Sequence, residues 1–393
     1  MHHLRITTLV SSPTLCCAKD GVPNREGWGA RSGMFDTLDL RAWHRRIVSG
    51  QSGLWAAPVR WAMGRLSRVY SWGVAARNRA FDCRGAAARL SVPVISVGNI
   101  IAGGTGKTPL VIDITGRLIE RGRKPAVISR GYRGGPDGLN DEHQLIQRHC
   151  PQAICLSDPD RVRGGQLAIQ RDGADVIVLD DAFQHRRIHR DFDIVLIDAT
   201  CPFGFDRLLP RGLLREPPWQ LRRADIIVIT RVDQVSPGDL AVIANRIRHY
   251  AAGTQILKCR HRPVSVSTLK TGVAPVLDPC GTSLEGKQVV CFAGVGNPEA
   301  FEATVASMGA EVVGRKWWPD HHRYHPKDMD ELLRAGRFPD FDLLVTTEKD
   351  AVKLTPLAPL PHPQIAVVGV KIELLDGGAT ILAARLDELL GTD

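Results

Sequence analysis

The hydrophobic pattern divides the chain into three regions. Between residues 91 and 250, short runs of consecutive apolar residues alternate with stretches of helical periodicity. Such runs are typical of strands buried on both faces, as in a parallel sheet that helices cover. The predicted strands are Val92–Val97, Pro125–Ser129, Ala153–Leu156, Val176–Leu179, Ile194–Ile197 and Ile226–Ile229.

The pattern after residue 250 predicts a linker and a second, smaller α/β lobe. Residues 251–285 carry Pro263, Pro275 and Pro279 with valines between them, which is typical of a linker with short extended pieces. From 286 to 393 the alternation of strand and helix patterns returns. The predicted elements there are the strands Gln288–Phe292, Leu343–Thr346 and Ile365–Val368 and the helix Pro298–Met308.

The region 40–90 is rich in arginine and tryptophan and predicts an amphipathic helix. From Val59 onward the apolar positions share one helical face, with Trp61 and Trp72 on its flank. An apolar stripe, a basic face and bordering tryptophans suit a helix that lies in a membrane interface. A helix packed on the protein's own core has the same pattern, and periodicity alone does not decide between them. The stripe consists of Ala62, Met63, Leu66, Val69, Tyr70 and Val74.

Composition narrows the class of protein but does not choose a function. The chain has 393 residues, 44% hydrophobic and 24% charged, which is typical of a globular protein with two domains. A formal charge of +9 favours an anionic partner: nucleotide, phosphorylated substrate, nucleic acid or anionic membrane. Nine cysteines without a C-x-x-C pair indicate reduced thiols in a cytosolic protein. We expect residues 1–39 to be a disordered extension, and the chain has no apolar run of about 18 residues.

A glycine-rich segment follows the first predicted strand. It reads Ala102-Gly103-Gly104-Thr105-Gly106-Lys107-Thr108 and precedes a helix-compatible stretch. Glycines let backbone N–H groups face one concavity, and a helix N-terminus adds partial positive charge, so the segment predicts a nucleotide-phosphate cradle. Lys107 would reach the β- and γ-phosphates, and the Thr108 hydroxyl would bind Mg²⁺. The full motif has a glycine where this chain has Ile101.

Two acids end a predicted buried strand further along. Asp180 and Asp181 follow the apolar run Val176–Leu179. A P-loop enzyme needs such an acid to hold Mg²⁺ or its water shell, whereas the alternative is a simple helix N-cap. The segment Ala182–His185 would line the same mouth, because α/β folds place ligands at the carboxyl ends of strands.

Other segments carry further candidate chemistry. Two arginines among glycines in Ser129–Gly135 suit a phosphate or a sugar phosphate. Asp141 and Glu142 supply carboxylates that would deprotonate an acceptor hydroxyl. Arg215 would neutralise charge on a transferring phosphoryl group, and Glu216 would assist the metal.

Histidines cluster in Trp317–His325, in the second half of the chain. Three histidines invite a zinc interpretation, but no cysteine and no regular ligand spacing supports it. Phosphoryl-transfer chemistry and a surface loop both stay open for this segment. Thr347–Lys353 ends another predicted strand and would cap or orient the cleft. Thr230–Asp233 is similar to the base-reading tetrad of GTPases, with arginine in place of lysine.

Taken in order, these motifs resemble the tetraacyldisaccharide 4′-kinase family, the lipid A 4′-kinases. Order and spacing hold from about residue 40 to 385, and the ordered set is far more specific than any single motif. The motifs are Val97–Asn99, Gly103–Pro109, Ser129–Tyr132, Asp141–Glu142, Asp180–His185, Leu208–Pro217, Gly294–Pro298, Pro319–His322 and Thr347–Asp350. Two positions depart from the family pattern: His143 stands where proline is usual, and Ala182 where glycine is commoner.

The resemblance implies a fold, an activity and a location. The fold is α/β: a P-loop NTPase-like parallel sheet sandwiched by helices, a second smaller α/β lobe on a two-stranded link, and an N-terminal amphipathic helix. The activity is transfer of the γ-phosphate of ATP, with Mg²⁺, to the 4′-hydroxyl of a tetraacyl glucosamine disaccharide 1-phosphate. The location is peripheral, on the cytoplasmic face of the bacterial inner membrane, with residues 54–79 touching the bilayer. We expect a monomer with no nucleic-acid partner.

The resemblance also assigns roles to residues. The expected metal ligands are Thr108, Asp180, Asp181 and Glu216, and the expected catalytic residues are Lys107, Arg215, Asp141 and His321. Among these, Asp141 paired with His321 from the second lobe is the expected base. Two other classes stay in view: a P-loop ATPase of the partition or metallochaperone type, and a non-catalytic nucleotide-dependent membrane adaptor. Ala102 disfavours the first, because it occupies the position of that class's signature lysine.

Overall fold

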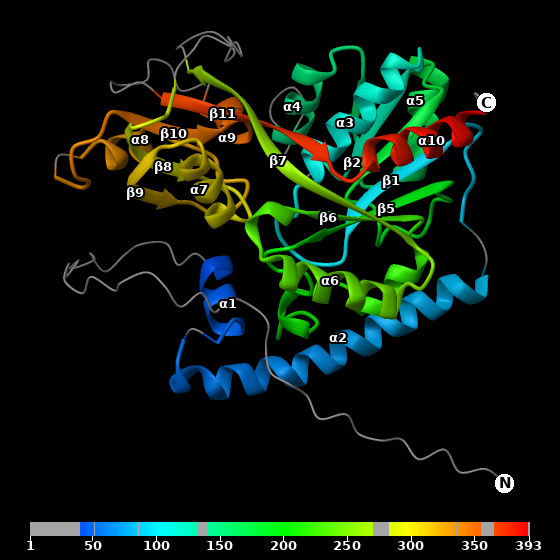
Figure 1. Cartoon of the computed structure of the whole chain (residues 1–393). Coiled ribbons are helices and arrows are strands. Elements are labelled where there is room, and N and C mark those ends of the chain that lie inside the picture. The colour runs from blue at the N-terminus through cyan, green and yellow to red at the C-terminus, as the bar shows by residue number, and fades with distance from the viewer. Residues whose placement is uncertain are drawn as a thin grey trace.

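The computed structural model describes residues 40–50, 52–84, 87–131, 140–269, 283–334, 336–354 and 365–391. The expected disordered extension, 1–39, lies outside the described residues. Eleven strands form one hydrogen-bonded series that spans a larger and a smaller lobe (Figure 1). The α/β fold class predicted from the sequence is confirmed.

Six parallel strands form the sheet of the larger lobe. In chain order they are β1 (Val94–Asn99), β2 (Pro125–Ser129), β3 (Ile154–Ser157), β4 (Val176–Asp180), β5 (Phe192–Asp198) and β6 (Ile226–Thr230). Their order in the sheet is β3-β2-β4-β1-β5-β6. All six predicted strands are present, and most of their residues are buried, as expected of a sheet with two covered faces. Because the strands are parallel, their carboxyl ends share one edge.

Helices cover both faces of this sheet. They are α3 (Lys107–Glu120), α4 (Asp141–His149), α5 (Arg161–Asp172), α6 (Pro237–Tyr250) and α10 (Gly378–Leu390). Leu110 of α3 and Leu382 of α10 belong to the same apolar cluster as Ile95 of β1. Ile247 of α6 packs in a separate cluster with Val195 of β5. The last helix therefore belongs to the larger lobe, although the sequence pattern assigned 286–393 to the smaller one.

A long two-stranded ribbon joins the lobes. β7 (Gln255–Thr268) runs parallel to β6 and antiparallel to β11 (Ile365–Leu374), from Leu374 opposite Cys259 to Ala366 opposite Thr268. The sequence predicted only short extended pieces here because Pro263 cannot donate a ladder hydrogen bond. A register shift between Gly369 and Val370 accommodates that position within one 14-residue strand. Pro275 and Pro279 lie outside the described residues.

The smaller lobe continues the sheet beyond β11. Its strands are β8 (Gln288–Ala293), β9 (Glu311–Trp317) and β10 (Leu343–Thr347), and its helices are α7 (Pro298–Ser307), α8 (Pro326–Leu332) and α9 (Glu348–Leu354). The elements β9, α8 and α9 were not predicted from the sequence. β9 lies at the end of the sheet and is only partly buried, so it lacks a continuous apolar run.

Two helices precede the sheet: the second runs along the outside of the larger lobe, and the first lies next to the smaller lobe (Figure 1). They are α1 (Leu40–Val48) and α2 (Ala57–Arg84), with a 3₁₀ turn at Leu54–Ala56 between them. The predicted apolar stripe of α2 is divided rather than continuous. Val74 is buried, whereas Leu66 and Val69 are exposed. Periodicity predicted the helix, and the exposure of Leu66 and Val69 shows that this part of the stripe does not pack on the protein's own core.

Candidate active site

The glycine-rich loop leaves the end of β1 and enters α3. Gly103 and Gly106 have φ angles of 139° and 82°, a region that strains residues with a side chain. Gly106 is the N-cap of α3 and forms no side-chain cap, so the first N–H groups of the helix stay available to an anion. Ile101 is buried and pairs with Leu214, which explains why this position carries no glycine. The loop has the geometry of a phosphate cradle.

Neighbouring segments hold the loop in place. Asn99 Nδ2 donates a hydrogen bond to Thr105 Oγ1 at 3.0 Å. Thr230 Oγ1 donates to the Thr105 carbonyl at 3.1 Å, and Arg231 Nη1 donates to the Gly104 carbonyl at 3.3 Å. Because strand ends fix the loop from several sides, its donors need little reorganisation when an anion binds.

Lys107, Asp181 and Arg215 form a charged triad beside the loop. Lys107 Nζ lies 3.4 Å from Asp181 Oδ1, and Arg215 Nη1 lies 2.8 Å from Asp181 Oδ2. Asp181 has a φ of 52°, which turns its carboxylate away from the axis of β4. Burial alone would raise the pKa of Asp181, but the charges of Lys107 and Arg215 outweigh it and hold that pKa well below its usual range. The structure brings these three predicted residues together.

Asp180 lies next to the triad in a different environment. Its carboxylate is almost fully buried, and Oδ1 has no hydrogen-bond partner among the described residues. Burial and the nearby Glu142 carboxylate raise the pKa of Asp180 to about 7. An unpartnered buried carboxylate oxygen is the kind of ligand that a hard cation satisfies. The residues present therefore fit a Mg²⁺ ion held between the strand end and bound phosphates.

Asp141 and His321 meet across the two lobes. Asp141 is the first residue of α4, and its two carboxylate oxygens lie 3.2 and 3.1 Å from His321 Nδ1. Burial would raise the pKa of Asp141, but the hydrogen bond with His321 and the charge of Lys349 hold it well below its usual range. His143 donates its backbone N–H to the N-cap residue Asn140 at 2.8 Å, a bond that proline would not form. This departure from the family pattern therefore leaves the start of α4 capped.

Two lysines of α9 surround this pair. Lys349 Nζ lies 3.1 Å from Glu142 Oε1 and 3.6 Å from Asp320 Oδ1. Burial would lower the pKa of Lys349, but the surrounding carboxylates raise it above its usual value. Lys353 Nζ lies 4.0 Å from Asp141 Oδ2. The smaller lobe thus supplies two fixed cations to the carboxylates of α4.

Glu216 lies apart from the expected metal ligands. Its side chain is fully buried and accepts from Arg77 of α2 at 2.8 Å and from Arg223 at 2.5 Å. Both carboxylate oxygens are therefore engaged by guanidinium groups rather than facing the loop. Its neighbour Arg215 does reach the site, as described above. These ion pairs anchor α2 to the larger lobe, and the expected role of Glu216 in metal binding stays a prediction.

The histidines of Trp317–His325 have different surroundings. His321 belongs to the site, whereas the His322 ring stacks on Trp318 and its Nε2 lies 2.9 Å from Asp328 Oδ2. The His325 backbone N–H donates to the same Asp328 carboxylate at 2.8 Å. Within the described ranges, no group of three or more His, Cys, Asp or Glu residues forms a metal cluster. These packing contacts give His322 and His325 structural roles.

The segments around the mouth are described only in part. Residues 132–139, which include much of the predicted cationic loop, lie outside the described residues. Gln184 donates to the Asn99 carbonyl at 2.8 Å and so supports the start of the glycine loop. His185 has a buried Nε2, and burial lowers the pKa of this imidazole to about 4. It is therefore neutral at physiological pH.

Sequence reasoning missed two buried residues of the site. Arg161 of α5 donates to the Asp158 carbonyl at 2.8 Å, and the charges of Asp180 and Asp181 act on it. His261 of β7 lies under the glycine loop, where a Cβ on Gly106 would be 2.5 Å from the ring. Neither residue belongs to a recognisable motif. In the sequence, nothing distinguishes Arg161 from an arginine on a helix surface, and the residues of β7 were predicted to be part of a linker.

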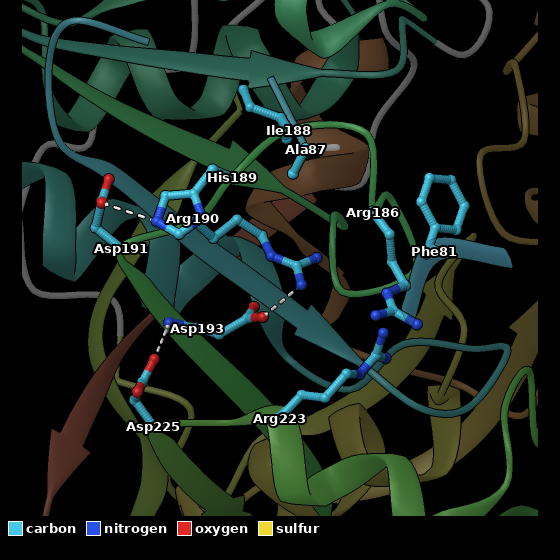
Figure 2. A pocket seen from close by; sticks show the side chains of 10 residues that line it. All are labelled: Phe81, Ala87, Arg186, Ile188, His189, Arg190, Asp191, Asp193, Arg223 and Asp225. Carbon is cyan, nitrogen blue, oxygen red and sulfur yellow. Dashed lines mark hydrogen bonds and ion pairs between the residues drawn. The ribbon is translucent and has the colours of Figure 1, made fainter. Parts of the chain in front are cut away.

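A cavity of about 330 Å³ lies elsewhere on the larger lobe (Figure 2). Its lining includes Arg186, Arg190 and Arg223 together with carboxylates, and the dashed lines of Figure 2 join Arg190 to Asp193. Asp193 is near the amino end of β5, roughly 16 Å of strand from Asp198 at the carboxyl end. The cavity therefore lies away from the glycine loop. Its charges pair with one another and support the sheet and α2.

Fold and site together define the class of protein. A parallel sheet, a glycine loop beside acidic residues, and an aspartate–histidine pair formed between two lobes are the parts of a nucleotide-dependent phosphotransferase of the P-loop class. The family model described as tetraacyldisaccharide-1-P 4′-kinase, LpxK, matches residues 59–390. The chain belongs to this family, and the resemblance drawn from its motifs is confirmed.

Relatives and a solved structure agree with this assignment. A tetraacyldisaccharide 4′-kinase of Anaeromyxobacter sp. (strain Fw109-5) is 40% identical over 368 residues, covering 88% of this chain and 95% of that protein. One from Syntrophus aciditrophicus (strain SB) is 40% identical over 331 residues, covering 76% and 85%. The crystal structure of LpxK from Aquifex aeolicus in complex with ATP superposes with a TM-score of 0.63 at 26% identity, covering 84% of this chain and 99% of that one.

Proposed function

We propose that this chain transfers the γ-phosphoryl group of ATP to the 4′-hydroxyl of a tetraacyl glucosamine disaccharide 1-phosphate. The observation that carries the proposal is the pairing of two unlike half-sites. One is the glycine loop with Lys107, Asp181 and Arg215, which suits a triphosphate. The other is Asp141 with His321, which suits a hydroxyl acceptor. Asp180 lies within electrostatic reach of both Lys107 and Glu142, so the half-sites share one centre.

The nucleotide half-site acts by placing charge. Lys107 and Arg215 lie beside the glycine loop, where they would neutralise the negative charge of the transferring phosphoryl group. The N–H groups at the start of α3 would add to this positive potential. Asp180, Asp181 and Thr108 are the residues that would hold Mg²⁺, and the ion would supply positive charge that neutralises the phosphates. Release of Asp181 from Lys107 and Arg215 would free both cations for the phosphates.

The acceptor half-site acts by accepting a proton. The pKa of Asp141 is held well below its usual range, so this carboxylate is ionised at neutral pH. A sugar hydroxyl is a far weaker acid, so its proton moves only late in the transfer, when the bond to phosphorus is forming. His321 fixes the direction of the carboxylate through Nδ1. Both half-sites come from one chain, which supports a monomer as the working unit.

We further propose that α1 and α2 attach the enzyme to the cytoplasmic face of the inner membrane. No helix in the described part of the chain is long and apolar enough to cross a bilayer. The outward residues of this region include large apolar side chains that are at least half exposed: Trp55 65%, Trp61 66%, Leu66 59%, Val69 62% and Trp72 74%. Arg65 lies 4.9 Å above the Trp61 ring. Exposed tryptophans beside arginines suit the interface between lipid headgroups and acyl chains.

Product analysis tests the proposed activity. Purified protein, Mg²⁺-ATP and the acylated disaccharide in mixed micelles are incubated, and the glycolipid is examined by mass spectrometry. We expect a gain of one phosphate on the distal sugar, together with ATP consumption that depends on the acceptor. ATP consumption that ignores the acceptor would favour a partition-type ATPase. Nucleotide binding without any consumption would favour an adaptor.

A further inference from the structure

A loop of the smaller lobe rests directly on the glycine loop. Gly294–Pro298 joins β8 to α7. A Cβ placed on Gly296 would lie 2.4 Å from the Gly104 nitrogen and 2.9 Å from its Cα. No side chain fits between these backbones, so the contact requires glycine at 296. The phosphate cradle is therefore in direct contact with the smaller lobe.

Asn297 links this contact to the larger lobe through its side chain. Its Nδ2 donates to Asp198 Oδ2 at 3.1 Å and to Thr200 Oγ1 at 3.0 Å. Its Oδ1 accepts the Ala300 N–H at 3.2 Å and caps α7. Asn297 and Asp198 are both buried, so these hydrogen bonds form away from bulk water. One amide side chain thus serves both lobes.

Asp198 continues the connection to the glycine loop. Its carboxylate forms an ion pair with Arg231, whose Nη1 also donates to the Gly104 carbonyl at 3.3 Å. Arg231 has a φ of 56°, an uncommon conformation for arginine, which directs its side chain toward the loop. Asn297, Asp198 and Arg231 therefore form a continuous path from the smaller lobe to the cradle.

We propose that Asn297 is a positioning residue that makes the phosphate cradle depend on lobe closure. When the lobes are together, its Nδ2 shares the Asp198 carboxylate with Arg231 and keeps that guanidinium aimed at Gly104. When they separate, Asp198 keeps only Arg231 and Thr200, and Gly296 no longer supports the loop. The cradle then keeps its hydrogen bonds with Asn99 and Thr230 but loses part of its support, which weakens the hold on the nucleotide and assists product release. This inference rests on the proposed function only where it concerns turnover.

The variant Asn297→Ser separates this role from helix capping. Serine caps helices about as well as asparagine, but it lacks the amide that reaches Asp198. We expect its unfolding temperature to stay within about 3 °C of the natural protein. We expect binding of a non-hydrolysable ATP analogue with Mg²⁺, measured by calorimetry, to weaken about tenfold, as loss of a buried hydrogen bond to a charged group implies. Asn245→Ser, on exposed α6, is the matched control and should change neither quantity.

A double variant tests the link with Asp198. Asn297→Asp keeps the cap but places a second carboxylate against Asp198, so analogue binding should weaken more than in Asn297→Ser. In the double variant with Asp198→Asn, the amide and the carboxylate have exchanged positions. One donor and one carboxylate then face each other again, so part of the affinity for the analogue should return. Hydrogen exchange gives an independent signal: the analogue should slow exchange at residues 294–300 in the natural protein and much less in Asn297→Ser.

The outcomes separate this inference from the proposed function. If Asn297→Ser bound the analogue as tightly as the natural protein does, the positioning role would be overturned. A lower unfolding temperature with unchanged affinity would overturn it as well. Failure of the natural protein to phosphorylate the glycolipid would overturn the proposed function. The binding and exchange measurements would still decide the role of Asn297, because neither requires turnover.

Discussion

The two half-sites are built in different ways. The nucleotide half takes its loop, its lysine, its acids and Arg215 from the larger lobe, within one parallel sheet and the segments that follow its strands. The acceptor half takes Asp141 from the larger lobe and His321 from the smaller one. The groups that we propose contact the phosphates in the first all come from a single lobe, although Gly296 and Asn297 of the smaller lobe support its loop. The second exists only while the lobes are together.

Contacts at the acceptor side also hold the lobes together. Besides the ion pair of Lys349 with Glu142, His149 Nε2 of α4 lies 3.3 Å from Glu348 Oε1 of α9. These pairs join the helix that carries the base to the helix that follows β10. Since the proposed base, Asp141, contacts a residue of the other lobe, an open enzyme would bind ATP without activating a water molecule to attack it. On this proposal, the division of the site protects ATP from unproductive hydrolysis.

Removing Lys107 should give the largest effect. Lys107→Ala takes a cation from the phosphates and leaves Asp181 with Arg215 alone. We expect glycolipid phosphorylation to fall at least about a thousandfold, measured with radiolabelled ATP. Lys124→Ala, an exposed lysine on the same lobe, is the control. Activity within tenfold of the natural protein would remove Lys107 from the mechanism.

Removing the base should affect turnover but not nucleotide binding. Asp141→Ala should lower kcat at least about a hundredfold, the scale of general-base catalysis, with the Kd for an ATP analogue unchanged. The two measurements distinguish the half-sites, because Lys107→Ala should change both. Asp172→Ala, at the end of α5, serves as control. A variant at position 141 with near-natural kcat would show that the acceptor needs no carboxylate there.

Weakening the membrane face should affect only the acceptor side. In Trp61→Ser with Trp72→Ser, two exposed indoles are lost from α2. Each indole contributes enough apolar area that vesicle binding should fall at least about tenfold. Flotation with anionic vesicles measures it, and KM for ATP in detergent should not change. Leu167→Ser, an exposed apolar residue on α5, is the control. Unchanged flotation would mean that α2 serves only as a strut for the larger lobe.

The smallest effect should appear in acid stability. Because the pKa of Asp141 is depressed in the folded protein, its contribution to stability is present above the unfolded value of 3.8 and is lost as pH falls through the folded value. Urea unfolding of the natural protein and of Asp141→Asn should therefore differ by roughly 2 kcal/mol at pH 6, and less at pH 3. A gap that widens on acidification would contradict the assigned pairing with His321.

Local patterns predicted most of the larger lobe. Each of its six strands is a short apolar run, and burial on both faces makes such runs recognisable without knowledge of their neighbours. β7 and α10 were not recognised for what they are, because their partners lie far away in sequence. β7 pairs with residues of β11 that lie roughly a hundred positions later, and α10 packs against α3. Long-range pairing leaves little trace in a local window.

The site followed the same rule. The glycine loop and the strand-end acids carry their chemistry in adjacent residues, so the motifs located them. The pairing of Glu216 with Arg77 and Arg223 was not predicted, because these partners are visible only in three dimensions. The sequence marked Gly294–Pro298 as a family motif, but the role that we propose for Asn297 was not predicted, because its partner Asp198 lies about a hundred positions earlier. Motifs therefore predicted the candidate reacting groups, whereas the groups proposed to position them required the fold.

The return of α10 to the larger lobe makes the smaller lobe an insertion rather than a tail. The chain leaves the larger lobe along β7, forms the smaller lobe, and returns along β11 before α10 packs on the sheet of the larger lobe. Thr268 and Ala366 stand opposite each other on this ribbon, so a tight hairpin there would bypass the whole excursion. Because β7 and β11 pair along this ribbon, any rotation of the smaller lobe against the larger one would bend both strands together.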